Sequence, residues 1–500
     1  MKRFALLTLC AIASPALAGP RVDTPAGRIE GLYTGAVEAF LGVPYAAPPI
    51  GASRWRPPAP ATRWTGMRQA SAIGADCVQD SKNNPLPVGY TNQQSEDCLF
   101  LNIWRPRATL GARLPVMVWI HGGAFIMGSG SMPDYDGAAL AARGAIVVTL
   151  NYRLGRFGTF VHPELLKEQA GQPIANYGLM DQIAALKWVR DNIAPFGGDA
   201  ANVTIFGESA GASSVNFLMT SPAAKGLFAR AISASGGRND VLDSIDAAAA
   251  KGSAWATIKR ATTLAQLRAL GADMILDAPV TVAARPVIDG KLVVARTDVA
   301  FRTGLAAKVP YLVGANDFEQ SLLRWFPGGG ETMVRQFGDK ASALLAAYAA
   351  SGDTRESQIG RLWGENAMTE PARWRAKQQA AHGAPVYLYR FAYVPEALRA
   401  TTPGVGHADE IPFVFGNGPA HPGYRWTAAD RATARLMGDY WLAFARTGNP
   451  NHAGAPDWPA FTPRADRLQL INAYGTSTVI DFARPRLDLI EAAAGSADAR

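Results

Sequence analysis

Cysteine and histidine are scarce in this chain, with three and six among its 500 residues, and long apolar runs are absent beyond the N-terminus. No group of these residues shows the spacing of metal ligands, so we expect no metal and no organic cofactor. No uninterrupted apolar stretch reaches the roughly 20 residues that a membrane-spanning helix needs. We therefore expect the mature chain to have no membrane anchor.

The excess of positive charge is small. Lys and Arg total 49 against 41 Asp and Glu, a net charge of +8. No basic run is interleaved with aromatic residues, so we interpret the charge as a solvated surface and expect no nucleic-acid partner. The hydrophobic content of 48% and the length are sufficient for one large α/β domain with insertions.

The N-terminus has the pattern of a signal peptide. Lys2 and Arg3 give a basic start, Phe4–Ala13 is apolar, and Ala16–Ala18 has the A-x-A form of a cleavage site. We expect cleavage after Ala18 and a secreted or periplasmic protein. Residues 1–18 are then the leader, and residues 19–500 form a single domain.

Cleavage would remove Cys10 and leave Cys77 and Cys98. An even pair of cysteines in an exported chain suggests one disulfide. It would close a loop of about twenty residues and stabilise the fold by roughly 3 kcal/mol. Two unrelated buried thiols are the alternative.

A serine motif lies between a predicted strand and a predicted helix. Asn202–Phe206 is β-branched and aromatic, Gly207–Gly211 reads Gly-Glu-Ser-Ala-Gly, and Ala210–Met219 has the composition of a buried helix. A bare Gly-x-Ser-x-Gly is a weak signal in a chain with 50 glycines. In this context it predicts a nucleophile elbow, with Ser209 on a tight turn and the Ala210 N–H facing an oxyanion.

A second glycine-containing segment follows another predicted strand. Pro115–Ile120 is continuously apolar, which is typical of a strand covered on both faces. His121, Gly122 and Gly123 follow it, and glycine amides at such a position can form the second part of an oxyanion hole. An ordinary glycine-rich turn is the alternative, and His121 is expected to hold the loop shape. Strands and helices alternate from Pro115 onward, so we predict a parallel sheet with right-handed crossovers.

Taken together, these segments resemble the type-B carboxylesterases, a family of α/β-hydrolases that includes bacterial p-nitrobenzyl esterases. The matching segments are Phe40–Pro49, Glu96–Asn102, His121–Phe125, Asn151–Gly155, Asn176–Gln182, Phe196–Asp199 and Gly207–Gly211. The resemblance implies an α/β-hydrolase fold: a mostly parallel central sheet with helices on both faces, a small N-terminal antiparallel hairpin, and helical insertions over the active site. It also supports a bridge between Cys77 and Cys98.

A serine nucleophile needs a neutral imidazole as base. In this fold type the acid and then the histidine follow the serine in the chain. The histidines after Ser209 are His382, His407, His421 and His452. We favour His407, because its glycine-flanked loop resembles the catalytic-histidine segment of the family, including the glutamate at Glu410.

Two carboxylates after the predicted strand Val309–Val313 are candidates for the acid. The segment of the family places its catalytic glutamate five positions after a glycine, which here is Glu319. Asp317 is the alternative, and Gln320 departs from the glycine that is usual in the family. Ser235 resembles the buried serine that helps to orient the acid.

The predicted activity is hydrolysis of small-molecule carboxylic esters through an acyl-enzyme, with a triad of Ser209, His407 and Glu319. The expected oxyanion donors are the backbone N–H groups of Gly122, Gly123 and Ala210. The same machinery acting on amides, lactones or carbamates is one rival, and a non-catalytic adhesion or binding protein is another. Since the base must be neutral, we expect activity to fall as the pH drops through roughly 6 to 7. Residues 318–380 are expected to include insertions that wall the pocket, and the sequence carries no signal for an oligomeric state.

Overall fold

The computed structural model describes residues 18–83, 86, 90–107, 111–238, 242–276, 285–349, 353–418 and 424–495. All of the predicted leader except Ala18 lies outside the described residues, and so does His421. Among the helices in the described ranges, none has the length and apolarity needed to cross a bilayer.

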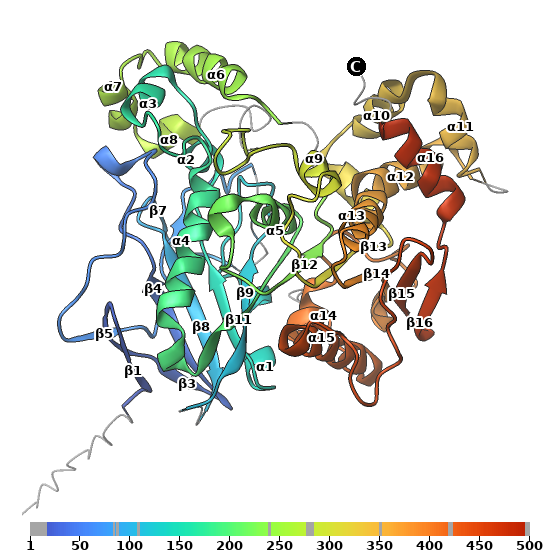
Figure 1. Cartoon of the computed structure of the whole chain (residues 1–500), viewed down its shortest axis with the longest axis horizontal. Helices are drawn as coiled ribbons and strands as arrows, with labels where there is room; N and C mark the ends of the chain where they lie inside the picture. The colour runs from blue at the N-terminus through green and yellow to red at the C-terminus, as the bar shows by residue number, and fades with distance from the viewer. Residues whose placement is uncertain are drawn as a thin grey trace, which may run out of the picture.

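An eleven-stranded mixed sheet forms the centre of the molecule (Figure 1). Its order is β16-β15-β14-β13-β12-β11-β9-β10-β8-β4-β3. In that order the strands are Gly475–Ile480, Arg467–Asn472, Val386–Ala392, Tyr311–Asn316, Arg230–Ala234, Gly198–Glu208, Leu114–Ile120, Ile146–Leu150, Phe100–Pro106, Val37–Pro44 and Leu32–Thr34. All neighbours from β15 to β10 pair in parallel, and the outer pairs are antiparallel. The predicted mostly parallel α/β fold is confirmed.

A smaller sheet lies at the N-terminus. The strands β1 (Arg21–Thr24) and β2 (Gly27–Glu30) form the predicted antiparallel hairpin, and β5 (Met67–Gln69) pairs with β2 in parallel.

Both faces of the central sheet are covered by helices. Along β9, alternate side chains enter two separate apolar clusters: Val118 belongs to one and Trp119 to the other. The first cluster packs under α4 (Tyr177–Asn192), α5 (Ala210–Thr220) and α13 (Glu370–Ala381). The second packs under α1 (Ala138–Ala141), α14 (Ile411–Phe415) and α15 (Ala428–Thr447).

Residues 318–364 divide between two main environments, while the rest of the segment 318–380 leads into α13 against the central sheet. Four residues in the 3-10 segment Glu319–Trp325 and just after it line the main cavity: Leu322, Arg324, Trp325 and Phe326. The helices α10 (Gly329–Phe337), α11 (Ala341–Ala346) and α12 (Arg355–Gly364) share a separate apolar cluster with α16 (Arg484–Gly495). In Figure 1 these four helices lie together at the upper right, and α6 (Ile245–Ile258), α7 (Leu264–Ala269) and α8 (Ala272–Leu276) lie at the upper left.

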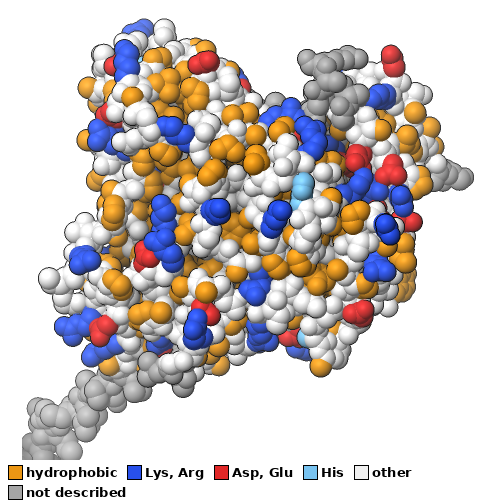
Figure 2. Space-filling view, viewed as in Figure 1, with side chains coloured by type: hydrophobic (Ala, Val, Ile, Leu, Met, Phe, Trp, Pro, Cys, Tyr) orange, Lys and Arg blue, Asp and Glu red, His pale blue; other side chains and the backbone are white. Residues whose placement is uncertain are grey.

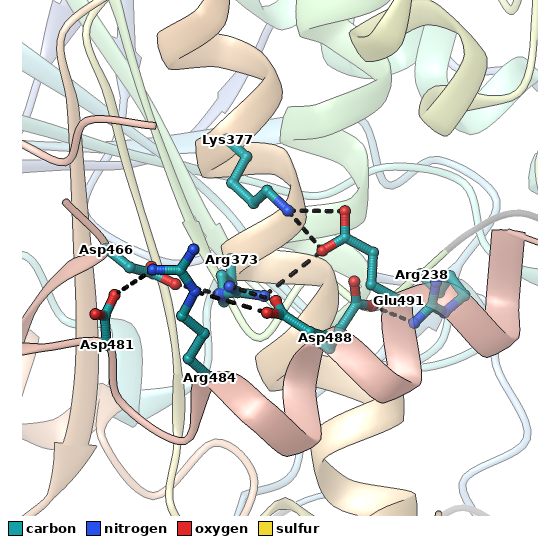
Figure 3. Close-up of polar contacts among 9 residues, drawn as sticks. Arg238, Arg373, Lys377, Asp466, Asp481, Arg484, Asp488 and Glu491 are labelled. Atoms are coloured by element: carbon teal, nitrogen blue, oxygen red, sulfur yellow. Dashed lines mark hydrogen bonds and ion pairs between the residues drawn. The ribbon is translucent and has the colours of Figure 1, made fainter. Parts of the chain in front are cut away.

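Ion pairs fasten α16 to α13 (Figure 3). The guanidinium of Arg373 pairs with Asp466, with Asp488 at 2.7 Å and with Glu491 at 3.5 Å, and only 5% of its side chain is exposed. Lys377, one turn along α13, pairs with Glu491 at 2.6 Å. The C-terminal helix is therefore held by charge as well as by apolar packing.

On the face of the molecule seen in Figure 2, the described basic side chains are dispersed. Figure 2 shows Lys and Arg spread over most of the visible face, with apolar and neutral surface between them. On this face, the distribution agrees with the interpretation of the positive charge as a solvated surface.

The sheet order creates a crevice at one edge. β9 lies between β10 and β11, so the chain leaves β9 toward one side and later returns to its other side. Loops that follow two adjacent parallel strands in such an order diverge, and ligands of open α/β sheets bind in the gap between them. Here the two loops are those after β9 and β11.

Candidate active site

The loop after β11 is a strained elbow. Ser209 separates β11 from α5 and has φ 54° and ψ −122°, a backbone conformation that non-glycine residues rarely adopt. The two flanking glycines permit it. A Cβ on Gly211 would lie 1.9 Å from the carbonyl oxygen of Ile120, and one on Gly207 would lie 2.6 Å from the Gly211 carbonyl carbon. Ser209 is thus fixed at the carboxyl edge of the sheet and the N-terminus of a helix.

The loop after β9 lies beside the elbow. A Cβ on Gly122 would be only 3.2 Å from Cβ of Ser209, and Gly123 has φ +99°. Gly122, Gly123 and Ser209 all line the same cavity. Among the described residues, no acceptor receives a hydrogen bond from the backbone N–H of Gly122, Gly123 or Ala210. Three unused donors therefore lie close to the serine.

His121 shapes this loop from behind. Its ring is buried, stacks on Tyr152 at 4.4 Å, and has Nδ1 2.8 Å from the carbonyl oxygen of Gly122. Burial lowers the pKa of His121 to about 4, so the ring is neutral. It does not line the cavity, in agreement with the structural role expected from the sequence.

His407 and Glu319 are hydrogen bonded. Nδ1 of His407 lies 2.7 Å from Oε2 of Glu319. The other carboxylate oxygen, Oε1, accepts bonds from the hydroxyl of Ser235 at 2.5 Å and from the Asn316 backbone N–H at 2.9 Å. Burial alone would raise the pKa of Glu319, but His407 and these donors outweigh it and lower the pKa below its usual value. The carboxylate is therefore ionised and its direction is fixed.

The alternative candidates have other contacts. Asp317 accepts a hydrogen bond from the backbone N–H of Val405 at 2.7 Å, while Glu319 is the residue that bonds His407. His382 and His452 are near the surface, where their ring nitrogens face carbonyl oxygens at 3.1 Å. Neither histidine lines the cavity.

The second ring nitrogen of His407 faces a different carboxylate. Its Nε2 lies 3.1 Å from Oε1 of Glu208, without the alignment of a hydrogen bond. Within the described ranges no hydrogen bond joins His407 to the hydroxyl of Ser209. The structure thus unites the predicted acid and base and places the serine on the wall of the same cavity, but it does not form the contact between serine and histidine.

Sequence reasoning did not anticipate the acidic surroundings of His407. Burial lowers the pKa of His407, but Glu208 and Glu319 outweigh this effect and raise it to about 10. Burial also raises the pKa of Glu208, and it raises that of Glu410 to about 7. Asn316 donates to Glu410 at 2.5 Å. The available signal for Glu208 was a carboxylate next to the serine, shortly after the apolar residues Ile205 and Phe206 of the strand.

The disulfide indirectly supports the loop after β9, which contains Gly122 and Gly123 and is called the glycine loop below. Cys77 and Cys98 are bonded to each other, as the sequence suggested. Gln79, two residues after Cys77, donates to the carbonyl oxygen of Gly128 at 2.9 Å and accepts from its N–H at 2.8 Å. Gly128 directly follows the turn in which the N–H groups of Ile126 and Met127 donate to the carbonyl oxygen of Gly123, and it lines the cavity. The bridged segment therefore supports one side of the cavity.

The cavity has a volume of about 1430 Å³. Besides the loops after β9 and β11, the cavity walls include residues from the ranges 156–161, 243–252, 285–287, 322–326, 393–413 and 424–426. Within the described residues, no group of three or more His, Cys, Asp and Glu side chains is arranged to hold a metal ion.

Comparison with known proteins gives a consistent answer. The profile of the Carboxylesterase family matches residues 18–347 and 331–484. The fumonisin B1 esterase of Sphingopyxis macrogoltabida is 37% identical, over 91% of this chain and 86% of its own. The para-nitrobenzyl esterase of Bacillus subtilis is also 37% identical, over 88% of this chain and 92% of its own.

Solved structures agree. A PNB esterase superimposes with a TM-score of 0.82 at 34% identity, covering 93% of this chain and 99% of its own. A Geobacillus stearothermophilus carboxylesterase gives a TM-score of 0.81 at 35% identity with the same coverage. The chain therefore belongs to the carboxylesterase family and is an α/β-hydrolase that acts on carboxylic esters.

Proposed function

We propose that the protein is an exported serine esterase in which Ser209 is the nucleophile, His407 the general base and Glu319 the residue that orients the base. The observation that carries the proposal is the hydrogen bond between Glu319 and His407. His407 lines the same cavity as Ser209, whose backbone is strained. The unused N–H groups of the glycine loop and the elbow supply the second requirement of acyl transfer, which is stabilisation of an oxyanion.

The reaction has two halves. The oxygen of Ser209 attacks the ester carbonyl carbon while its proton passes to His407 Nε2, and the N–H groups of Gly122, Gly123 and Ala210 bind the oxyanion. Collapse breaks the bond to the alkoxide, which leaves as the alcohol with the proton from His407. Water then attacks the acyl-enzyme with His407 again as base, and the carboxylic acid leaves Ser209 with its proton restored.

Glu208 enters this scheme as a proton partner of His407. Burial raises the pKa of Glu208, and the carboxylates of Glu208 and Glu319 raise that of His407, so Glu208 and the ring compete for a proton. The reactive form has a neutral imidazole, which the raised pKa of His407 shifts to higher pH. Nε2 is then free to exchange its contact with Glu208 for the hydroxyl of Ser209, since apo contacts of this kind often tighten only with substrate.

The test is to label the protein with a fluorophosphonate probe and map the modified peptide by mass spectrometry. We expect the label on Ser209, and we expect Ser209→Ala to lower kcat by about four orders of magnitude or more with the fold intact. Ser53→Ala, a change at an exposed serine far from the elbow in sequence, is the matched control. Near-normal hydrolysis by Ser209→Ala, or a label on another serine, would contradict the proposal.

Export is proposed from the leader pattern of residues 1–18 and is supported by the disulfide, since such bonds persist in oxidising compartments. The intact mass of the protein recovered from the periplasm or medium should correspond to residues 19–500. A mature protein that retains Met1 would argue against cleavage.

Small-molecule esters are the proposed substrates. The similar proteins are named for fumonisin B1 and for para-nitrobenzyl esters. The cavity is larger than the about 300–1000 Å³ typical of ligand pockets, so bulky acyl or alcohol groups are expected to fit.

A further inference from the structure

A buried arginine lies on the wall of the catalytic cavity. Arg156 belongs to the short helix α2 (Gly155–Gly158), lines the cavity and is only 9% exposed. The N–H of Gly155 donates to the carbonyl oxygen of Phe125 at 2.7 Å, so α2 rests directly against the glycine loop. Arg156 and Ser209 therefore line the same cavity.

No carboxylate neutralises this guanidinium. Among the described residues, Arg156 has no ion-pair partner and its guanidinium makes no hydrogen bond; its contact is the ring of Trp255, whose centroid is 4.7 Å away. Burial lowers the pKa of Arg156 to about 10, which leaves it charged at neutral pH. Three other buried arginines are paired with carboxylates: Arg54 with Glu96, Arg105 with Glu38, and Arg153 with Asp181. Arg390, also 9% exposed, instead donates to the Thr369 hydroxyl and to the Asp317 carbonyl oxygen.

An unpaired buried charge is costly, and removing its partner group from a buried pair typically destabilises a protein strongly. This free-energy cost is present at Arg156, whereas a carboxylate offsets it at each of the paired arginines. The face of the guanidinium is covered by an aromatic ring, which leaves its N–H groups for the cavity. A ligand in the cavity can supply the missing negative charge.

We infer that Arg156 is a specificity-determining residue that binds a carboxylate carried by the ester substrate, so that the preferred substrates are anionic esters such as half-esters of dicarboxylic acids. The inference rests on the proposed function and names its substrate class. A planar guanidinium binds a carboxylate through two parallel N–H···O bonds, and these are strong in a water-poor site. The other cations of the wall differ: Lys251 is paired with Asp243, and Arg285 and Arg324 are exposed.

The experiment compares monoethyl glutarate with its neutral amide analogue, ethyl 4-carbamoylbutanoate, by ethanol release. We expect the wild-type protein to prefer the anionic ester, and Arg156→Gln to reduce this preference by about 10- to 100-fold, mainly through KM. Arg156→Lys keeps the positive charge but cannot make the two parallel N–H···O bonds of a guanidinium fork. We expect it to lose part of the preference for the anionic ester. Arg324→Gln removes the same charge from an exposed part of the wall and should change the preference by less than about twofold in 0.15 M salt.

A second pair of substrates, 4-acetoxybutanoate and its amide, places the carboxylate on the alcohol side and shows from which side it reaches Arg156. Wild-type protein with no preference for either anionic ester, or an equal effect of Arg156→Gln and Arg324→Gln, would overturn the inference. If Arg156→Gln does not fold, a full wild-type preference in Arg156→Lys would likewise overturn the role of the fork.

Binding separates this inference from the proposed function. In the Ser209→Ala background, calorimetry with glutarate should show binding that Arg156→Gln weakens by about tenfold or more, whether or not the wild type hydrolyses esters. Glutarate binding that does not depend on Arg156 would overturn the carboxylate site. Loss of hydrolysis with Arg156-dependent binding retained would refute only the esterase mechanism.

Discussion

At the scale of single residues, the charge around His407 is the feature with the largest effect on function. Its imidazole bonds Glu319 on one side and faces Glu208 on the other. An unperturbed histidine with a pKa near 6.5 predicts loss of activity through roughly pH 6 to 7. The structure changes that expectation, since the carboxylates raise the pKa to about 10 despite burial.

The raised pKa of His407 determines how activity should depend on pH. Only the neutral imidazole can accept the serine proton, and a raised pKa keeps the inactive, protonated form to a higher pH. We therefore expect kcat/KM to rise with pH and to have its acidic inflection above pH 7. A profile measured from pH 5 to 10.5 tests this, and an inflection at or below 6.5 would show that the carboxylates do not act as described.

Substitution of Glu208 tests whether this carboxylate raises the pKa of His407. Glu208→Gln removes the largest contribution that raises the pKa of His407, so we expect the inflection to move down by about one unit or more. Glu356→Gln, at an exposed glutamate of α12, is the control and should leave the profile in place. Equal profiles for both variants would assign the shift to another group.

Some residues of the site could be predicted from the sequence, and others could not. Chain order narrowed the base to four histidines, and the resemblance to the family favoured His407 and preferred Glu319 to Asp317. The structure shows a hydrogen bond between this preferred pair. The contact between Glu208 and His407 depends on side-chain directions around the elbow, which no sequence pattern specifies. Arg156 was missed for a similar reason, because a missing counter-charge is visible only once its neighbours in space are known.

At the scale of elements, strands and helices with strong local patterns were predictable. The apolar run before His121 is β9, and Thr427 and Asp430 form the capping box that begins α15. β14 (Val386–Ala392) was not identified, although Gly383 and Pro385 mark a turn between it and the preceding helix. The attachment of α16 to α13 was likewise beyond local pattern, since it depends on ion pairs between residues about 100 positions apart (Figure 3).

The attachment of α16 can be tested at Arg373. Arg373→Met keeps much of the side-chain volume but leaves Asp466, whose side chain is 9% exposed, without its cation. We expect a loss of about 3 kcal/mol or more in the free energy of unfolding, measured by urea titration. Arg399→Met breaks an exposed pair with Glu396 and should cost less than about 1 kcal/mol. Similar costs for the two variants would mean that the buried pairs contribute little.

At the scale of the whole molecule, one sheet runs through the described chain from β3 to β16, with an apolar cluster on each face. Composition and length pointed to a single α/β domain, but not to this strand order or to which helices cover which face. Order and coverage are set by contacts between segments far apart in the chain, and a local pattern does not encode them.

We expect the mature protein to unfold as one unit, because separating either half would split the sheet and expose both clusters. Scanning calorimetry should show a single endotherm, with a calorimetric enthalpy equal to the van't Hoff enthalpy. Two resolved endotherms would indicate independent domains in place of the single domain predicted for residues 19–500.

The separation between the reacting edge and the cavity walls has a consequence for laboratory evolution. The nucleophile and its glycine neighbours sit in a tightly packed corner of the sheet, where almost no change is tolerated. The walls at residues 243–252 and 322–326 come from excursions outside that sheet. Libraries randomised at these wall residues should change which substrates the protein accepts, while the residues that break the ester bond stay the same. New substrate selectivities should therefore need only a few mutations.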